Sequence, residues 1–263
     1  DFFAGILTVQ VGHCHPRVTE AAIEQQRKLV HVSTLYPTVP QVKLAEKLVQ
    51  IKPMKDPAKV FFTNSGTEAN ETAVTLAKEA TGRTELVVLR HNYGGRGTLA
   101  LSTMGVKQYR PRVQSEIPGV RYAHSPYCYR CDFDLKYPDC GIACADYLEY
   151  MIQNEGDVAA VLAETVVGTN GVLIPPPGYY QKLRRICDEN NVLLIADEVM
   201  AGWGRTGKWF AIDHWGVQPD ILTTAKGITS AYVPLGLTAV SEKISAFFED
   251  NLFQPAWIEN ARK

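Results

Sequence analysis

The chain has 263 residues, with 27 basic and 28 acidic side chains and a formal net charge of −1. This balance gives no strong field of either sign, which argues against nucleic acid or an anionic membrane as a partner. The hydrophobic content of 46% suits one α/β domain, and no apolar run resembles a membrane span or signal peptide, so we expect a cytoplasmic protein.

The amino-terminal part predicts a strand or hairpin and two helices. Residues 2–11 are typical of a strand or hairpin that leads into the turn Gly12-His-Cys-His-Pro16. Apolar residues at helical spacing then predict helices within 18–29 and around 44–49. The His and Cys residues of the turn could suggest a metal, but no further ligands lie nearby in the sequence, so we favour a structural turn.

A strand at residues 59–63 feeds the segment Asn64-Ser-Gly-Thr-Glu-Ala-Asn-Glu71, and alanines at helical spacing follow it. Ser65 and Glu68 have the spacing of a capping box, which would simply begin a helix. The same geometry leaves free N–H groups at a helix N-terminus, where the helix dipole favours a phosphate. We therefore predict both a well-capped helix and a phosphate site.

A strand at residues 85–90 is followed by a loop that contains Tyr93. Beyond it, Cys128 and Cys131 have the spacing of zinc ligands, and Cys140 with Cys144 could complete a set of four. Against zinc, Cys144 falls at the start of a predicted helix, and many cytosolic cysteines are small hydrophobic residues. The metal and the packing interpretations both remain open for these four cysteines.

Three nearly uninterrupted apolar runs, at 158–163, 192–196 and 221–225, end on Glu164, Asp197 and Lys226. Such runs suit strands of a parallel sheet that is covered on both faces, and ligands of such sheets lie outside the carboxyl ends of the strands. A helix near 179–187 joins the first two runs, as expected for a parallel crossover. A late strand at 235–240 and a closing helix beyond it complete the predicted elements.

Asp197 and Lys226 together have two interpretations. An ion pair that closes the edge of the core is the simpler one. Alternatively, a desolvated lysine amine becomes a nucleophile that forms a Schiff base with an aldehyde, and the carboxylate keeps a pyridine nitrogen charged.

Five sequence blocks decide between these interpretations. They are Gly12-His-Cys-His-Pro16, Asn64 to Glu71, Ile195-Ala-Asp-Glu-Val199, Gly202-Trp-Gly-Arg-Thr-Gly207, and Pro219-Asp-Ile with Ala225-Lys226-Gly227. In this order they resemble the signature of class III aminotransferases that depend on pyridoxal 5′-phosphate (PLP), the omega-aminotransferase group. The resemblance implies the large domain of fold type I, a three-layer α/β fold with a mainly parallel central sheet.

The resemblance also implies a domain division. Residues 1–52 would lead into a large PLP-binding domain at 53–252, followed by a divergent tail at 253–263. We expect the smaller carboxy-terminal domain of the family to be absent, so that the chain is a fragment, and we expect a homodimer for the full-length protein.

The resemblance assigns residues around the cofactor. Ser65, Gly66 and Thr67 would hold its phosphate. The ring would lie between the Tyr93 side chain on one face and Val199 on the other. No metal is implied.

The same resemblance makes Lys226 and Asp197 the catalytic pair. Lys226 would carry the cofactor and move protons, and Asp197 would keep the ring nitrogen charged. Glu164 would lie near the ring and orient neighbouring polar groups. Arg205 is assigned a structural role in the glycine-rich loop.

Some positions depart from the family pattern: Gly94 stands where His is usual, Thr165 where Pro is common, and Met200 where Gln often contacts the ring hydroxyl. The predicted function is transfer of an amino group from an omega-amino, beta-amino or related amine donor to a 2-oxo acid such as pyruvate or 2-oxoglutarate. The alternatives are a PLP-dependent isomerase or decarboxylase on the same fold, or a catalytically inactive truncated paralogue.

Overall fold

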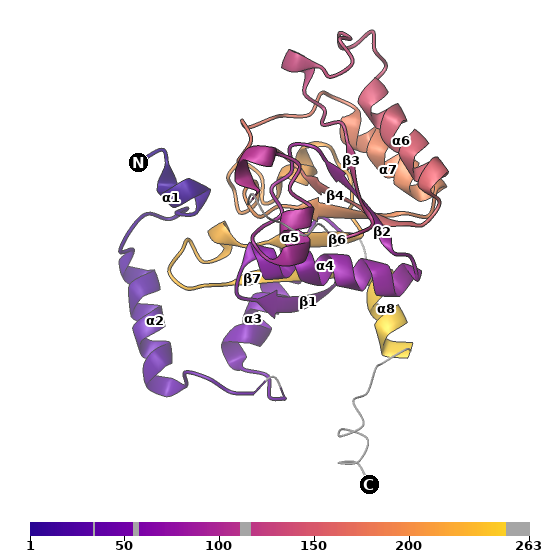
Figure 1. The fold of residues 1–263 in the computed structure, drawn as a ribbon. Helices are drawn as coiled ribbons and strands as arrows, with labels where there is room; N and C mark the ends of the chain where they lie inside the picture. The colour runs from indigo at the N-terminus through magenta and orange to yellow at the C-terminus, as the bar shows by residue number, and fades with distance from the viewer. Residues whose placement is uncertain (34, 55–57, 111–116, 251–263) are drawn as a thin grey trace.

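The computed structural model describes residues 1–33, 35–54, 58–110 and 117–250. A seven-stranded sheet lies at its centre, with the strand order β1-β7-β6-β5-β4-β2-β3 (Figure 1). The strands are β1 (Ala58–Thr63), β2 (Glu85–Leu89), β3 (Val120–Ala123), β4 (Val158–Glu164), β5 (Leu193–Asp197), β6 (Ile221–Thr224) and β7 (Gly236–Ser241). Neighbours from β3 to β6 are parallel, and β7 is antiparallel to both β1 and β6. The mainly parallel sheet predicted from the sequence is therefore confirmed.

Helices cover both faces of this sheet. The α-helices are α1 (Ala4–Leu7), α2 (Pro16–Lys28), α3 (Val39–Ile51), α4 (Gly66–Thr81), α5 (Thr98–Ser102), α6 (Ala143–Glu155), α7 (Tyr179–Glu189) and α8 (Glu242–Asp250). The described residues also form the short 3-10 helices η1 (Lys107–Tyr109), η2 (Cys128–Arg130), η3 (Ala211–His214) and η4 (Lys226–Ile228). None of the α-helices in the described part of the chain is long and apolar enough to cross a membrane.

Alternate residues of the central strands belong to two separate core clusters. Leu193 and Ile195 of β5 pack with the alanines of α4 and with Ile244 of α8, whereas Leu194 and Ala196 pack with α6 and α7. This two-residue period is what a strand buried on both faces requires. The predicted three-layer arrangement is confirmed.

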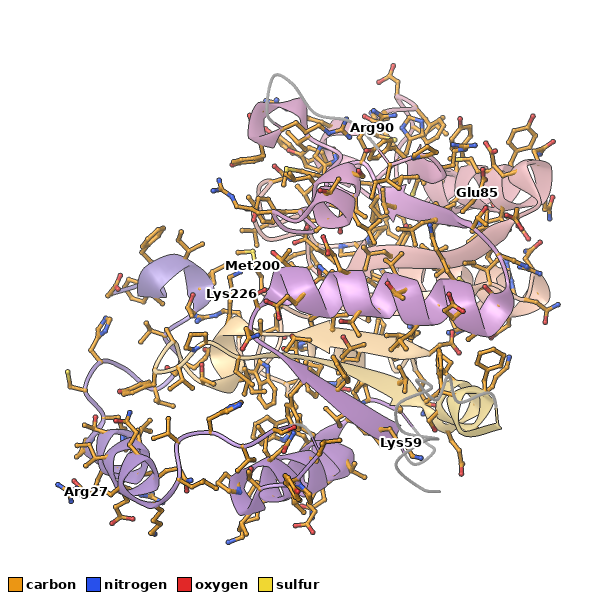
Figure 2. All side chains as sticks on the ribbon, turned by 60° about the horizontal axis from the view of Figure 1, so that its bottom comes forward. Arg27, Lys59, Glu85, Arg90, Met200 and Lys226 are labelled. Carbon is orange, nitrogen blue, oxygen red and sulfur yellow. The ribbon has the colours of Figure 1, made fainter. Side chains whose placement is uncertain are left out.

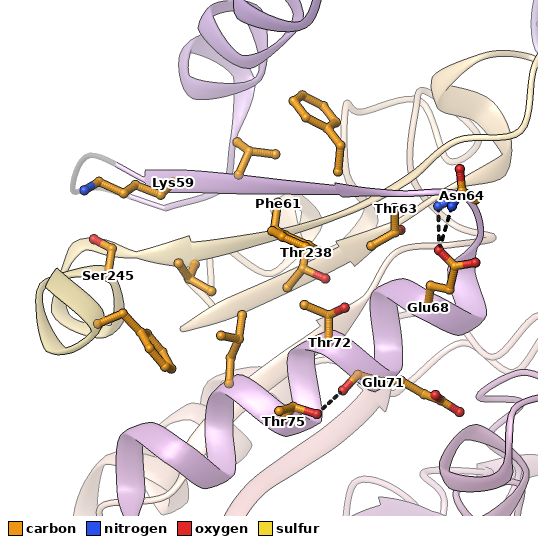
Figure 3. Close-up of a pocket in the computed structure, with 15 residues that line it drawn as sticks. Lys59, Phe61, Thr63, Asn64, Glu68, Glu71, Thr72, Thr75, Thr238 and Ser245 are labelled. Carbon is orange, nitrogen blue, oxygen red and sulfur yellow. Dashed lines mark hydrogen bonds between the residues drawn. The ribbon is translucent and has the colours of Figure 1, made fainter. Parts of the chain in front are cut away.

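The start of α4 differs in one detail from the predicted capping box. The Glu68 backbone N–H donates to Ser65 Oγ at 3.2 Å, as expected. The Glu68 carboxylate accepts from the Asn64 backbone N–H at 2.8 Å and from Asn64 Nδ2 at 3.1 Å, one residue before the predicted partner (Figure 3). The helix therefore begins where predicted, with its reciprocal bond shifted by one residue.

One predicted element is wrong. Residues 2–11 do not form a strand or hairpin; the segment contains α1, in which Gly5 and Ile6 have φ values of 58° and 63°. Left-handed residues turn the chain too sharply for an extended ladder, which apolar alternation alone does not reveal. The predicted helices within 18–29 and around 44–49 are present as α2 and α3. The predicted tail at 253–263 lies outside the described residues.

Candidate active site

The carboxyl ends of β4, β5 and β6 lie side by side. Glu164 is opposite Asp197 in the β4–β5 register, and Asp197 is opposite Thr223 in the β5–β6 register. Because residues two apart on a strand share a face, Asp197 lies on the α4 side with Ile195. The strand order therefore brings together polar residues from three separate segments under the N-terminal half of α4.

Asp197 is held by hydrogen bonds from both sides and is only 3% exposed. Its Oδ1 accepts from the Val199 backbone N–H at 2.9 Å, and its Oδ2 accepts from Asn70 Nδ2 at 2.8 Å. Burial raises the pKa of Asp197 above its ordinary value, although these hydrogen bonds and the charge of Lys226 act in the opposite direction. The result is a fixed carboxylate that holds a proton more readily than an exposed one.

Asn70 of α4 was not among the predicted site residues. Its Nδ2 also donates to the Gly94 carbonyl at 2.9 Å, and its Oδ1 accepts from Thr223 Oγ1 at 2.7 Å. The sequence carries a signal for it, since an asparagine one helical turn after Gly66 interrupts the apolar face of a helix. Asparagine is a poor helix former and is seldom buried without partners.

Glu164 is buried at the end of β4 and joins two loops. Its Oε1 accepts from the Tyr93 backbone N–H at 2.6 Å, and its Oε2 accepts from the Gly168 N–H at 2.9 Å. Burial, with Asp197 as a second cause, raises the pKa of Glu164 to about 8 against the effect of these bonds. Glu164 thus fixes the backbone that carries Tyr93.

Lys226 lies just beyond β6, at the start of η4, with φ of 46°. A left-handed lysine is a strained conformation of a kind found at functional sites. Burial lowers the pKa of Lys226, and the nearby carboxylates of Asp197 and Glu164 only partly offset this. The amine is therefore neutral more often than that of an exposed lysine and is correspondingly more nucleophilic.

These residues border one cavity of about 250 Å³. Tyr93 and Val199 both line it, as do Gly66 and Thr67 from the first turn of α4. A β-carbon at Gly66 would come within 2.8 Å of Val199 Cγ1, so only glycine allows this approach. Ser65 does not line the cavity, and its hydroxyl is used to cap α4.

Another cavity and a group of cysteines lie apart from Lys226 and Asp197. A larger cavity of about 800 Å³ lies between β1, α4 and α8 and does not border Lys226 (Figure 3). Cys128, Cys131, Cys140 and Cys144 line another small cavity as free thiols. Within the described residues, no three His, Cys, Asp or Glu side chains are arranged as metal ligands.

Comparison with known proteins gives the family. The sequence model of the class-III aminotransferase family matches residues 1–260. The chain belongs to this family. Members of the family depend on PLP, in agreement with the resemblance of the five sequence blocks.

Named relatives and a solved structure agree with this assignment. An acetylornithine aminotransferase of Methanopyrus kandleri is 40% identical, over 95% of this chain and 59% of its own length. A leucine/methionine racemase of Thermococcus litoralis is 38% identical, over 86% of this chain and 52% of its own length. The crystal structure of an (S)-enantioselective omega-transaminase from Thermomicrobium roseum superposes with a TM-score of 0.91 at 36% identity, over 95% of this chain and 58% of its own. The chain thus spans less than two thirds of each of these proteins.

The cavity fits PLP in three respects. The first backbone N–H groups of α4 have no partner within the helix and suit a phosphate. Tyr93 and Val199 provide a planar and a branched apolar side chain at the same cavity. The Lys226 amine and the buried Asp197 carboxyl group are the kinds of group that would suit the aldehyde and the ring nitrogen of PLP.

Proposed function

We propose that the whole protein is a PLP-dependent transaminase. It would move an amino group from an omega-amino, beta-amino or related amine donor to a 2-oxo acid such as pyruvate or 2-oxoglutarate. The observation that carries this proposal is a lysine amine of lowered pKa beside a buried carboxylate, in a cavity at a helix N-terminus. The family supports the reaction, and the omega-transaminase from Thermomicrobium roseum supports the donor class.

Each predicted site residue receives a role in this proposal. Lys226 Nζ would hold PLP covalently, while Gly66 and Thr67, with Ser65 at the cap, would hold its phosphate at the start of α4. Tyr93 and Val199 would enclose the ring from its two faces. PLP, when bound, supplies a carbonyl that condenses with amines and a ring that accepts electrons from the substrate.

The protons would be handled by the chain's own side chains. The raised pKa of Asp197 suits a carboxyl that shares its proton with a ring nitrogen, and Asn70 keeps its Oδ2 in place. The lowered pKa of Lys226 leaves Nζ free to accept a proton from the substrate carbon that bears the amine. Glu164 would position Tyr93 through its hydrogen bond to the backbone.

Covalent attachment tests the proposal directly. The full chain is incubated with PLP, reduced with borohydride and analysed by peptide mass spectrometry, with Lys226→Arg as the variant and Lys208→Arg as the matched control. Lys226→Arg keeps the positive charge but cannot form the bond, so the adduct should vanish only there. Reduced cofactor on other lysines, with none on Lys226, would refute the assignment.

An isomerase is the second candidate, because the Thermococcus litoralis relative is a leucine/methionine racemase. The same site could return the proton to the opposite face of the substrate carbon and leave the amino group in place. Chiral chromatography of a single L-amino acid incubated without any 2-oxo acid distinguishes the reactions. Racemisation under these conditions favours an isomerase, and loss of carbon dioxide favours a decarboxylase.

Three wider statements belong to the same proposal. The whole protein would be a cytoplasmic homodimer, and residues 53–252 would form its large domain after an amino-terminal segment at 1–52. Light scattering on the full-length protein tests the dimer, and cell fractionation tests the location. A folded chain that binds no PLP would instead indicate a catalytically inactive paralogue.

A further inference from the structure

A second cavity, of about 690 Å³, adjoins the cofactor cavity through Met200. Met200 lines both cavities, and Figure 2 shows it beside Lys226, which shares the smaller one. Gly168 leaves room for the Met200 side chain, since a β-carbon at Gly168 would lie only 2.4 Å from Met200 Sδ. The Thr169 hydroxyl donates to Met200 Sδ at 3.3 Å. Met200 therefore borders both the 690 Å³ cavity and the cavity that contains Lys226.

The walls of the 690 Å³ cavity beside Met200 are mainly apolar. Val166, Ile174 and Pro177 from the β4–α7 connection line it together with Trp215 and Leu7. No Asp or Glu is among the described residues that line it. A ligand with an apolar body would fit these walls, and nothing in them repels negative charge.

Arg205 places an uncompensated positive charge in this apolar cavity. Its Nε and Nη2 atoms are buried and have no hydrogen-bond partner among the described residues. Arg205 also takes part in no ion pair within the described part of the chain. A guanidinium group never loses its proton in proteins, so burying its N–H groups unpaired is costly. A bidentate anion removes that cost.

We propose that Arg205 binds the remote anionic group, a carboxylate or sulfonate, of the amine substrate, with the connecting carbon chain passing Met200. This inference rests on the proposed function for its place in a reaction and replaces the structural role that the sequence assigned to Arg205. It makes Arg205 a residue that determines specificity for amines with an anion several bonds from the nitrogen. One hydrogen bond to a charged partner corresponds to about a ten- to hundredfold change in affinity, so a bidentate pair should change the affinity by at least about tenfold.

The first experiment measures binding without any reaction. Isothermal titration of the PLP-loaded full chain compares 4-methylpentanoate with its uncharged amide, 4-methylpentanamide, neither of which can condense with PLP. The corresponding sulfonate, 3-methylbutane-1-sulfonate, distinguishes the two kinds of anion. We expect the wild type to bind the anions at least about tenfold more tightly than the amide.

Two variants locate this preference. Arg205→Met keeps an apolar chain of similar length and should abolish the preference, whereas the exposed Arg185→Met is the matched control and should retain it. If Arg205→Met does not fold, Arg205→Lys serves instead, because a single ammonium cannot reproduce the bidentate pair. Equal affinity of the wild type for acid and amide, or an unchanged preference in Arg205→Met, would overturn the inference.

The second experiment links the anion site to the reaction. The donor half-reaction of the loaded full-length protein is followed with 4-aminobutanoate and with butylamine, in the absence of any 2-oxo acid. Arg205→Met should raise the half-saturating concentration of 4-aminobutanoate about tenfold or more and leave that of butylamine unchanged. Failure of PLP to attach to Lys226 would refute the proposed function, and the same anion titrations, run on the PLP-free chain, would still decide the role of Arg205.

Discussion

Replacing Asn70 by alanine tests the buried network under α4. The substitution removes the hydrogen bonds from Nδ2 to Asp197 Oδ2 and to the Gly94 carbonyl, and the bond from Thr223 Oγ1 to Oδ1. It also leaves buried acceptors without a donor, which costs more than the loss of a bond in water. The affected groups lie on α4, β5, β6 and the loop after β2, so the loss acts on the whole site.

The expected loss is large. The bond to a carboxylate corresponds to about 1.5–3 kcal/mol, and each of the two neutral bonds to about 1 kcal/mol. The better helix propensity of alanine returns about 0.5 kcal/mol. We therefore expect Asn70→Ala to lower the free energy of unfolding by about 3–4.5 kcal/mol, measured by urea denaturation of the PLP-free chain.

A matched substitution separates burial from residue type. Asn154 is exposed on α6 and donates to the Tyr150 carbonyl of its own helix at 2.7 Å. Asn154→Ala should change the free energy of unfolding by no more than about 0.5 kcal/mol. A loss below about 1 kcal/mol in Asn70→Ala, or equal losses in both variants, would show that the network does not stabilise the fold as argued.

Three further predictions concern neighbouring groups. Gly66→Ala should lower the affinity for PLP, because the new β-carbon would clash with Val199. The double variant Gly66→Ala/Val199→Ala should recover part of that affinity. Equilibrium dialysis measures the PLP affinity of both variants, and no recovery in the double variant would contradict the steric explanation. Burial raises the pKa of Glu198 to about 7, so the folded state retains a proton that the unfolded state loses above about 4.5. The contribution of Glu198 to the free energy of unfolding should therefore fall as pH rises from about 4.5 to 7. Urea titrations at several pH values should show that Glu198→Gln lacks this fall. Parallel plots of stability against pH for the wild type and the variant would refute the prediction. Asp197→Asn should lower the pKa of Lys226 further, because the substitution removes a carboxylate that raises this pKa. Trinitrobenzenesulfonate should therefore label Lys226 faster at pH 8 in the variant than in the wild type. An unchanged labelling rate would contradict the prediction.

The sequence alone was sufficient for the elements that place the three charged site residues. Uninterrupted apolar runs are typical of strands buried on both faces, and the structure places β4, β5 and β6 at these runs, with Glu164 and Asp197 at strand ends and Lys226 two residues beyond β6. The start of α4 was equally clear, because a capping serine and a regular apolar face are local signals. The order of the strands then makes these ends neighbours.

Only the tertiary structure decided which polar groups meet there. Asn70 lies 127 residues from Asp197 and 153 from Thr223 along the chain, and no local pattern encodes a contact across such separations. The unpaired nitrogens of Arg205 are likewise visible only when the cavity around them is known. Local propensity and apolar periodicity determine elements, whereas hydrogen-bond partners between elements depend on how the sheet and its covering helices pack.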